Sequence, residues 1–196
     1  MTQQQNATDG HRRPVHKFGG SSLADAACFH RVADIINSQR QPDALIVVSA
    51  SGKTTNRLIE LLNLFTSGDN AAAATLEGLY SFQRGLIENT LDETEAAALL
   101  ATLDEDINTI AGVLENHRLD DYQRSFIQSF GELWSSRLLA SLLNSQGVPA
   151  ASLDARRFLR VSGSPVQVDE AHSRQQLHEI LAEHPDQTLV VTGFIA

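Results

Sequence analysis

The chain has 196 residues, enough for one α/β domain with a sizeable core, and its 42% hydrophobic and 20% charged residues are ordinary for a globular protein. With 24 Asp and Glu against 15 Lys and Arg, the net charge of −9 argues against a nucleic-acid surface, which needs a basic face, but not against ATP, which needs only a local positive site. No apolar run approaches the roughly 20 residues of a membrane span, and the one cysteine, Cys28, excludes an internal disulfide and fits a reducing, cytoplasmic setting.

The first part of the chain predicts two strand–helix units. A short strand over residues 14–18 runs into a glycine pair, and a helix follows with Ser22 as its expected N-cap. The continuous, β-branched run at 44–49 predicts a strand buried on both faces, as in a parallel sheet. A second helix is expected over about 55–66, with Thr54 or Thr55 capping it.

The middle of the chain, residues 69–146, is predicted to be helical. Residues 69–118 are rich in Ala, Leu and acidic residues, and their apolar spacing indicates two or three amphipathic helices. A long helix is expected over about 121–146, and Gly147 stands where a glycine commonly ends a helix.

The last part returns to alternating strands and helices. "VPAASLDAR" predicts a weaker strand, 169–182 a helix, and "TLVVTGF" a buried strand. The order predicts an α/β/α layered domain with a largely parallel sheet over residues 14–196, after a disordered lead-in at 1–13. Because a buried strand and turn stop at Ala196, we interpret the chain as the front part of a longer protein.

Two segments compete as the phosphate site. "SGKTT" contains the Gly-Lys-Thr of a P-loop, but the first glycine of the pattern G-x-x-x-x-G-K-S/T would fall at Val47, inside a strand. "HKFGGSS" is the stronger candidate, because Lys17 ends a strand, Gly19 and Gly20 allow close approach of an anion, and a helix N-terminus follows. The alternative for this segment is a tight turn with an exposed lysine.

"FGELWSSRLL" places Glu132 on the long helix. Glu132 lies on a face with Ser125, Ser129 and Ser136, beside the apolar stripe, so a mostly enclosed helix would bury it. A buried carboxylate among serines is suited to a ligand ammonium group. The pattern leaves open the alternative of a solvated glutamate.

Taken in order, "KFGGSS", "VVSASGKTTN", "GELWS", "LDARRFL" and "VVTGF" resemble the aspartate kinases over residues 15–196. The opening segment looks closest to the bifunctional aspartokinase–homoserine dehydrogenases of the methionine-pathway type. The resemblance implies the amino-acid kinase fold, an open three-layer α/β/α sandwich that is incomplete in this chain. It also implies transfer of the ATP γ-phosphate to the side-chain carboxylate of L-aspartate, giving 4-phospho-L-aspartate, the first step of Lys, Thr and Met biosynthesis.

The same resemblance implies roles for individual residues. The phosphate-binding residues would be Lys17, Gly19, Gly20 and Ser21, with Lys17 as the catalytic residue that stabilises the phosphoryl group in transfer. The aspartate-binding residues would be Ser49, Thr55 and Glu132, the last holding the α-ammonium group. Asp154 and Arg156 match a family motif for which we expect a structural role, and the lysine of Gly-Lys-Thr, Lys53, is expected to be accidental.

The implied partners are L-aspartate, ATP with Mg²⁺, and further copies of the full-length protein in a homo-oligomer. No metal ligands are expected in the chain itself, because the histidines have no ligand spacing. The segments that bind adenine, ribose and the aspartate carboxylate in relatives do not occur here, so we expect these residues alone to lack measurable kinase activity. The alternatives are another amino-acid kinase, which Thr55-Asn56 and Gly131-Glu132 disfavour, and a non-catalytic binding module that docks through 69–118.

Overall fold

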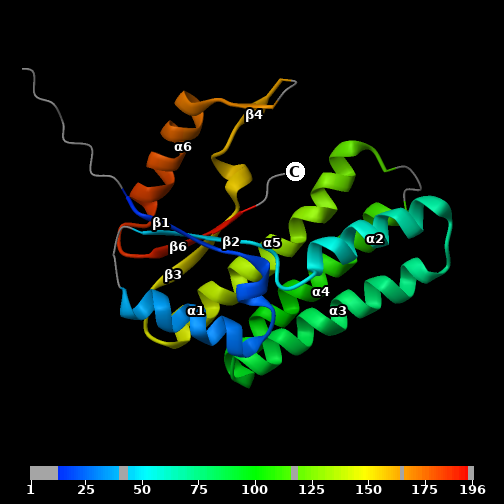
Figure 1. Ribbon diagram of the computed structural model, residues 1–196, viewed down its shortest axis with the longest axis horizontal. Helices are drawn as coiled ribbons and strands as arrows, with labels where there is room; N and C mark the ends of the chain where they lie inside the picture. Colours follow the sequence, from blue (N-terminus) through cyan, green and yellow to red (C-terminus); the bar gives the residue numbers. More distant parts are fainter. Residues whose placement is uncertain (1–12, 40–43, 116–118, 164–165, 194–196) are drawn as a thin grey trace, which may run out of the picture.

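A computed structural model of the chain describes residues 13–39, 44–115, 119–163 and 166–193 (Figure 1). Nearly all of the lead-in expected at 1–13 therefore lies outside the described residues, as do the last three residues of the chain. Within the described part, no helix is both long and apolar enough to cross a membrane.

A four-stranded parallel sheet lies at the centre of the fold. The strands stand in the order β1-β2-β6-β3. Their bounds are β1 Val15–Phe18, β2 Leu45–Val48, β3 Ala150–Leu153 and β6 Thr188–Thr192. All three neighbouring pairs are parallel, which confirms the sheet type that the apolar runs predicted. Because β6 pairs between β2 and β3, the end of the described chain is buried in the middle of the sheet.

Helices cover both faces of this sheet and complete the predicted three layers (Figure 1). Ile46, Val48 and Val190 alternate toward the larger core, which the helices α1 to α5 enclose. Leu189 and Val191 face the other side and pack with Ile180 of α6. Each of the strands β2 and β6 is buried on both faces, which explains why its sequence is a continuous apolar run.

The helices match most of the predicted boundaries. Their bounds are α1 Ala26–Ser38, α2 Thr54–Ser67, α3 Ala71–Thr90, α4 Glu93–Glu115, α5 Asp121–Ser145 and α6 Glu170–Glu183. The predicted "two or three" amphipathic helices over 69–118 are thus α3 and α4. Gly147 adopts a left-handed φ of 77° just after α5, as expected for a glycine that ends a helix.

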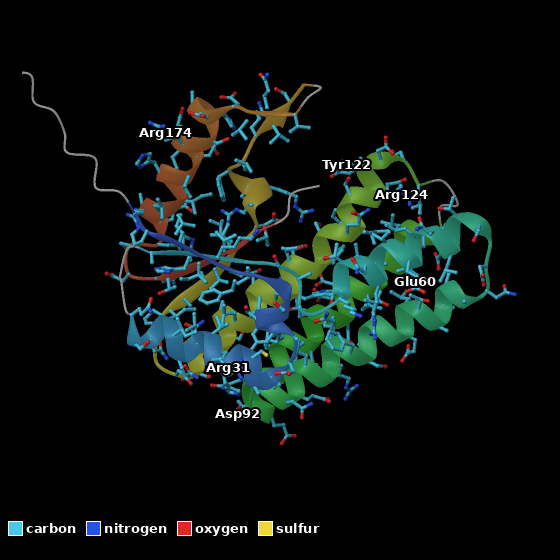
Figure 2. All side chains as sticks on the ribbon, viewed as in Figure 1. Arg31, Glu60, Asp92, Tyr122, Arg124 and Arg174 are labelled. Atoms are coloured by element: carbon cyan, nitrogen blue, oxygen red, sulfur yellow. The ribbon has the colours of Figure 1, made fainter. Side chains whose placement is uncertain are left out.

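The long helix α5 is the central helix of the larger core. A capping box starts it, in which the Asp120 side chain accepts from the Gln123 N–H and the Gln123 side chain accepts from the Asp120 N–H. Near this end, Arg124 donates to Asn63 Oδ1 of α2 at 2.9 Å, and Figure 2 shows Arg124 beside that helix. Farther along, Trp134 donates to Asp106 Oδ2 of α4 at 2.9 Å. From Ser129 to Leu143, α5 is buried nearly all round, so this part of the helix is enclosed.

Two predicted helix starts were wrong. Ser22 is not an N-cap, because a short 3₁₀ helix, η1 (Gly20–Leu23), intervenes, and Asp25 caps α1 by accepting from the Cys28 N–H at 2.8 Å. Neither Thr54 nor Thr55 caps α2, since α2 begins at Thr54 after Lys53, and the Thr54 hydroxyl instead donates to Ser51 O. Both errors arise because polar residues near a helix start compete for the same backbone groups.

Besides η1, three short elements were not expected from the sequence. They are a two-residue antiparallel hairpin of β4 (Val161–Ser162) and β5 (Gln167–Val168), and a 3₁₀ helix, η2 (Ala155–Arg157). Each is too short to produce a readable hydrophobic period.

Candidate active site at the carboxyl edge of the sheet

Three chain segments meet where the parallel strands end. The turn between β2 and α2, residues 49–53 and called here the β2–α2 turn, is bonded to the loop after β1 by Ser49 N–H to Phe18 O and by Gly52 N–H to Gly20 O, each at 3.0 Å. After β6, Gly193 N–H donates to Val48 O at 2.8 Å. Ligands of open α/β sheets gather at this edge.

Two glycines let these segments come so close. A Cβ added at Gly20 would stand 2.7 Å from Ala50 O, and one added at Gly193 would stand 2.8 Å from Val48 O. Gly19 differs, because an added Cβ there would meet no atom within 4 Å. Gly20 is therefore required by the packing of two loops, whereas Gly19 borders open space.

Lys17 lies beside this edge on the face of the sheet that α6 covers. It pairs in register with Val47, which packs in the core cluster of α6, and partners in neighbouring strands point to the same face. The Lys17 side chain is exposed, as is Ser21 in η1. The structure thus leaves the ammonium group of Lys17 accessible at the start of the glycine loop.

Glu132 reaches the β2–α2 turn from α5. The residue is 4% exposed, and its Oε1 accepts the Ala50 backbone N–H at 3.2 Å. Its Oε2 is buried without a hydrogen-bond partner among the described residues. Burial raises the pKa of Glu132 above its ordinary value, and the hydrogen bond from Ala50 only partly opposes this shift. The solvated alternative is therefore wrong.

Gly131 explains how α5 comes near enough for this contact. A Cβ added at Gly131 would stand 2.8 Å from Ala50 Cβ and 3.5 Å from Thr54 Cγ2. Any larger residue would push α5 away from the turn and lengthen the bond from Ala50 to Glu132. Gly131 thus lets α5 approach the turn, and Glu132 makes the hydrogen bond that this approach allows.

The hydroxyl groups around the turn form two sets. Ser51 and Thr54 are fully buried and bonded, with Thr54 Oγ1 donating to Ser51 O at 2.7 Å. Ser49 and Thr55 are half-buried, and their hydroxyls have no hydrogen-bond partner within the described part of the chain. The first set holds the turn together, and the second set is free to meet a ligand.

In the Gly-Lys-Thr segment, backbone N–H groups that a phosphate cradle would turn toward its ligand are bonded within the protein. Gly52 adopts a left-handed φ of 55°, but its N–H is bonded to Gly20 O. Lys53 is exposed at the residue before α2. The geometry agrees with the expectation that this match to a P-loop is accidental.

Asp154 and Arg156 form an internally satisfied pair after β3. Arg156 Nη2 lies 2.5 Å from Asp154 Oδ2, and its Nη1 donates to Ser129 Oγ of α5 at 2.8 Å. Burial alone would raise the pKa of Asp154, but the hydrogen bonds and charge of Arg156 outweigh it and lower the pKa below its ordinary value. The Arg156 guanidinium also lies over the ring of Phe126 in α5. The pair therefore connects η2 to α5, which agrees with the structural role expected for it.

The structure therefore brings Gly19, Gly20, Ser49 and Glu132 to one edge, with Thr55 on the first turn of α2. Sequence reasoning missed Gln83 of α3, which is 2% exposed and donates to Thr54 Oγ1 at 3.0 Å. The only signal that marked Gln83 was a polar residue next to the apolar positions of a predicted amphipathic helix, and that signal is too common to identify a contact.

Comparisons with known proteins agree with this architecture. The model of the amino acid kinase family matches residues 12–196. The bifunctional aspartokinase/homoserine dehydrogenase 2 of Escherichia coli (strain K12) is 43% identical over 185 residues, which are 94% of this chain and 23% of that protein. The bifunctional aspartokinase/homoserine dehydrogenase 1 of Arabidopsis thaliana chloroplasts is 30% identical over 190 residues, covering 93% of this chain and 21% of that protein. The chain thus spans less than a quarter of the length of these relatives.

A solved structure gives the same fold. E. coli aspartokinase III in complex with aspartate and ADP matches with a TM-score of 0.80 at 24% identity, over 93% of this chain and 41% of that chain. At this identity the likeness speaks for the fold alone, which is the open α/β/α sandwich expected from the sequence. Since the family model covers nearly the whole sequence, the chain belongs to the amino acid kinase family.

Proposed function

We propose that this chain carries the aspartate pocket and the phosphate loop of an aspartate kinase, which transfers the ATP γ-phosphate to the side-chain carboxylate of L-aspartate. The observation that carries the proposal is the buried Glu132, with one oxygen held by the Ala50 N–H and the other without a hydrogen-bond partner among the residues that the structure describes. A buried carboxylate with a vacant acceptor is costly unless a cation completes it. The α-ammonium group of aspartate is such a cation.

Three side chains would hold the amino acid. Glu132 Oε2 would accept from the α-ammonium group, in a charge-assisted bond strengthened by burial. The hydroxyls of Ser49, in the β2–α2 turn, and of Thr55, in the first turn of α2, would donate to aspartate oxygens. Because Ala50 fixes Glu132 to that turn, the ammonium site and the hydroxyls would keep a constant separation.

The loop after β1 would hold the phosphoryl group in transfer. Lys17 offers an exposed ammonium group at the start of the loop, and Gly19 borders open space in which a phosphate oxygen can approach the backbone. Gly20 and Ser21, at the start of η1, would add backbone N–H donors. These donors would neutralise the negative charge that spreads over the phosphoryl oxygens in the transition state.

The chemistry requires little else from the chain. The aspartate side-chain carboxylate is ionised at neutral pH, so it attacks the γ-phosphorus without a general base. Its oxygen forms the new bond to phosphorus as the bond to the β–γ bridging oxygen breaks, and ADP leaves. Catalysis then consists of alignment and charge neutralisation. Mg²⁺ would enter with ATP, coordinated by phosphates and water.

The relatives support this substrate assignment. Their names give aspartokinase activity to proteins 43% and 30% identical to this chain, and aspartokinase III has been solved with aspartate and ADP. We also propose a cytoplasmic location and a homo-oligomeric full-length protein, with homoserine dehydrogenase activity in a further domain, following the bifunctional relatives.

The test is a titration of the ¹⁵N-labelled chain with L-aspartate, followed by its amide NMR signals. We expect shifts at Ser49, Ala50 and Thr55. L-malate, in which a hydroxyl replaces the ammonium group, is the matched ligand control and is expected to cause no shifts at these residues.

The protein control is Glu132→Gln, which keeps the shape of the side chain but removes its charge. Loss of the aspartate response in this variant supports the ammonium site. An unchanged response, or equal binding of malate, would contradict the assignment of Glu132. Tight binding of a protein partner through α3 and α4, with no ligand response at all, would instead favour the binding-module alternative.

A further inference from the structure

We propose that Gln83, on α3, is a positioning residue for the aspartate pocket, because it fixes the β2–α2 turn against which Glu132 is held. Its hydrogen bonds within the described part of the chain go to the buried hydroxyls of Ser51, in the turn, and Thr54, at the start of α2, and it acts through them. The inference rests on the proposed function.

The contact is made by the side-chain amide of Gln83. Its Nε2 donates to Thr54 Oγ1 at 3.0 Å and lies 3.4 Å from Ser51 Oγ. Thr54 Oγ1 already donates its own proton to Ser51 O, so toward Gln83 it must act as the acceptor. Rotating the Thr54 hydroxyl therefore cannot replace the donor that Gln83 supplies, and the other hydroxyl near Thr54 Oγ1, Ser51 Oγ, lies farther away, at 3.4 Å.

All members of this network are shielded from water. Gln83 is 2% exposed, Thr54 1% and Ser51 0%. Without Gln83, the two hydroxyls would lose a donor that water cannot restore unless the turn opens. Removing the amide therefore favours an opened or shifted turn.

A second residue of α3 supports the turn beside Gln83. The ring of Phe82 lies against Gly52, where an added Cβ would stand 3.9 Å from Cζ. The guanidinium of Arg57 lies over the same ring, 5.5 Å from its centroid. Phe82 thus packs against the turn and Gln83 hydrogen-bonds to it, so α3 contacts the turn at two adjacent positions.

This network is next to the groups that would bind substrate. Ser51 follows Ala50, whose N–H holds Glu132 Oε1, and Thr54 precedes Thr55. A shift of the turn would therefore move the ammonium site and a substrate hydroxyl together. It also gives α3, part of the helical stretch for which the sequence showed no function, a role in the pocket.

The experiment compares Gln83→Met with Thr90→Val in the 196-residue chain. Both residues lie on α3, both are buried, and both changes replace a polar group by an apolar one of similar shape. Thr90 donates only to Leu86 O within its own helix, so its loss has no route to the turn. Thermal unfolding and the NMR titration with L-aspartate are measured for each variant.

We expect Gln83→Met to raise the Kd for L-aspartate about fivefold or more, the effect of weakening one buried hydrogen bond in the site. Amide hydrogen exchange at residues 50–55 should quicken without ligand. Thr90→Val should lower the unfolding temperature but leave the Kd within about twofold of the unmodified chain. Gln83→Asn, whose shorter amide cannot reach Thr54, should weaken binding in the same direction.

The outcomes separate the two proposals. If the unmodified chain binds aspartate and a folded Gln83 variant binds it equally well, the positioning role is wrong while the proposed function stands. If the unmodified chain does not bind aspartate, the proposed function fails and the inference fails with it. Equal weakening by Gln83→Met and Thr90→Val would mean that Gln83 only stabilises α3, which also overturns the inference.

Discussion

The Ala50 backbone N–H donates to Glu132 Oε1 at 3.2 Å, which joins a turn after β2 to a helix 82 residues later in the sequence. The contact exists because Gly131 lets α5 approach Ala50. It leaves the second oxygen of a buried carboxylate without a partner in the described part of the chain. Glu132 thus lowers the stability of the free chain, and a ligand ammonium group bound there would supply the missing hydrogen-bond partner.

Replacing Glu132 by Gln should stabilise the free chain at neutral pH while abolishing aspartate binding. The neutral amide removes the cost of burying a charge and keeps an acceptor for the Ala50 N–H. We expect the free energy of unfolding, measured with urea at pH 7, to rise by about 1 kcal/mol. Glu179→Gln on α6 is the control, because Glu179 is exposed and should change little. A less stable Glu132→Gln chain would show that the buried carboxylate stabilises the free fold, and would contradict the prediction.

Aspartate affinity should rise with pH as Glu132 loses its proton. Burial raises the pKa of Glu132 above its ordinary value, so between that value and the raised pKa the folded chain holds a proton that the unfolded chain has lost. The free energy of unfolding should therefore fall as pH rises through this window, while affinity for the ammonium group increases. NMR titrations with L-aspartate from pH 4.5 upward would measure the affinity, and urea unfolding over the same pH range would measure the stability. An affinity independent of pH would argue that Glu132 stays ionised throughout.

Gly131→Ala should destabilise the chain although alanine favours helices. The added Cβ would stand 2.8 Å from Ala50 Cβ, and this overpacking is expected to cost about 1–3 kcal/mol. Gly78→Ala on α3 is the matched control, because its Cβ would meet nothing within 4 Å and should stabilise by about 0.5–1 kcal/mol. Urea unfolding of both variants measures the contrast. Opposite signs are expected, and two stabilised variants would mean that α5 shifts at little cost.

Lys17→Met should remove the response to phosphate without affecting stability. Lys17 and Lys53 are the two lysines of the sequence, and both side chains are exposed. With inorganic tripolyphosphate as the probe, we expect NMR shifts at Gly19, Gly20 and Ser21 that Lys17→Met abolishes and Lys53→Met retains. The reverse result would restore the P-loop interpretation of Gly-Lys-Thr. Unfolding temperatures should stay nearly unchanged for both, since neither side chain is buried.

Asp154→Asn should cost stability at neutral pH and little in acid. Since the pKa of Asp154 is lowered in the folded chain, its ionised form stabilises the fold above the unfolded pKa of about 3.9, and this contribution is lost as pH falls through the folded value. The pair is partly exposed, so we expect about 1 kcal/mol at pH 7. Glu88→Gln, in the exposed pair with Arg84, is the control and should change almost nothing. A loss that is equal at pH 7 and pH 3 would point to packing rather than charge.

The sequence by itself determined the elements, the layers and most candidate residues. Continuous β-branched runs marked β2 and β6 because strands buried on both faces exclude polar residues, and helical spacing marked α1 to α6. The order of these elements predicted parallel pairing, which the sheet confirms. Residue type and position made the phosphate loop and Glu132 candidates with open alternatives, and their expected roles came from the resemblance to the aspartate kinases.

Only the tertiary structure decided which of these residues meet. Whether Glu132 faces solvent or the core depends on the approach of α5 to Ala50, and no period along α5 records that distance. The helix starts near Ser22 and Thr54 depend on local contacts, but several polar side chains there could bond to the backbone, and only the structure shows that Asp25 accepts from the Cys28 N–H and that Thr54 donates to Ser51 O. The role of Gln83 could not be predicted because its hydrogen-bond partners lie 29 and 32 residues away in the sequence. Such long-range contacts follow from packing, whereas sequence patterns report only local periodicity and local hydrogen bonding.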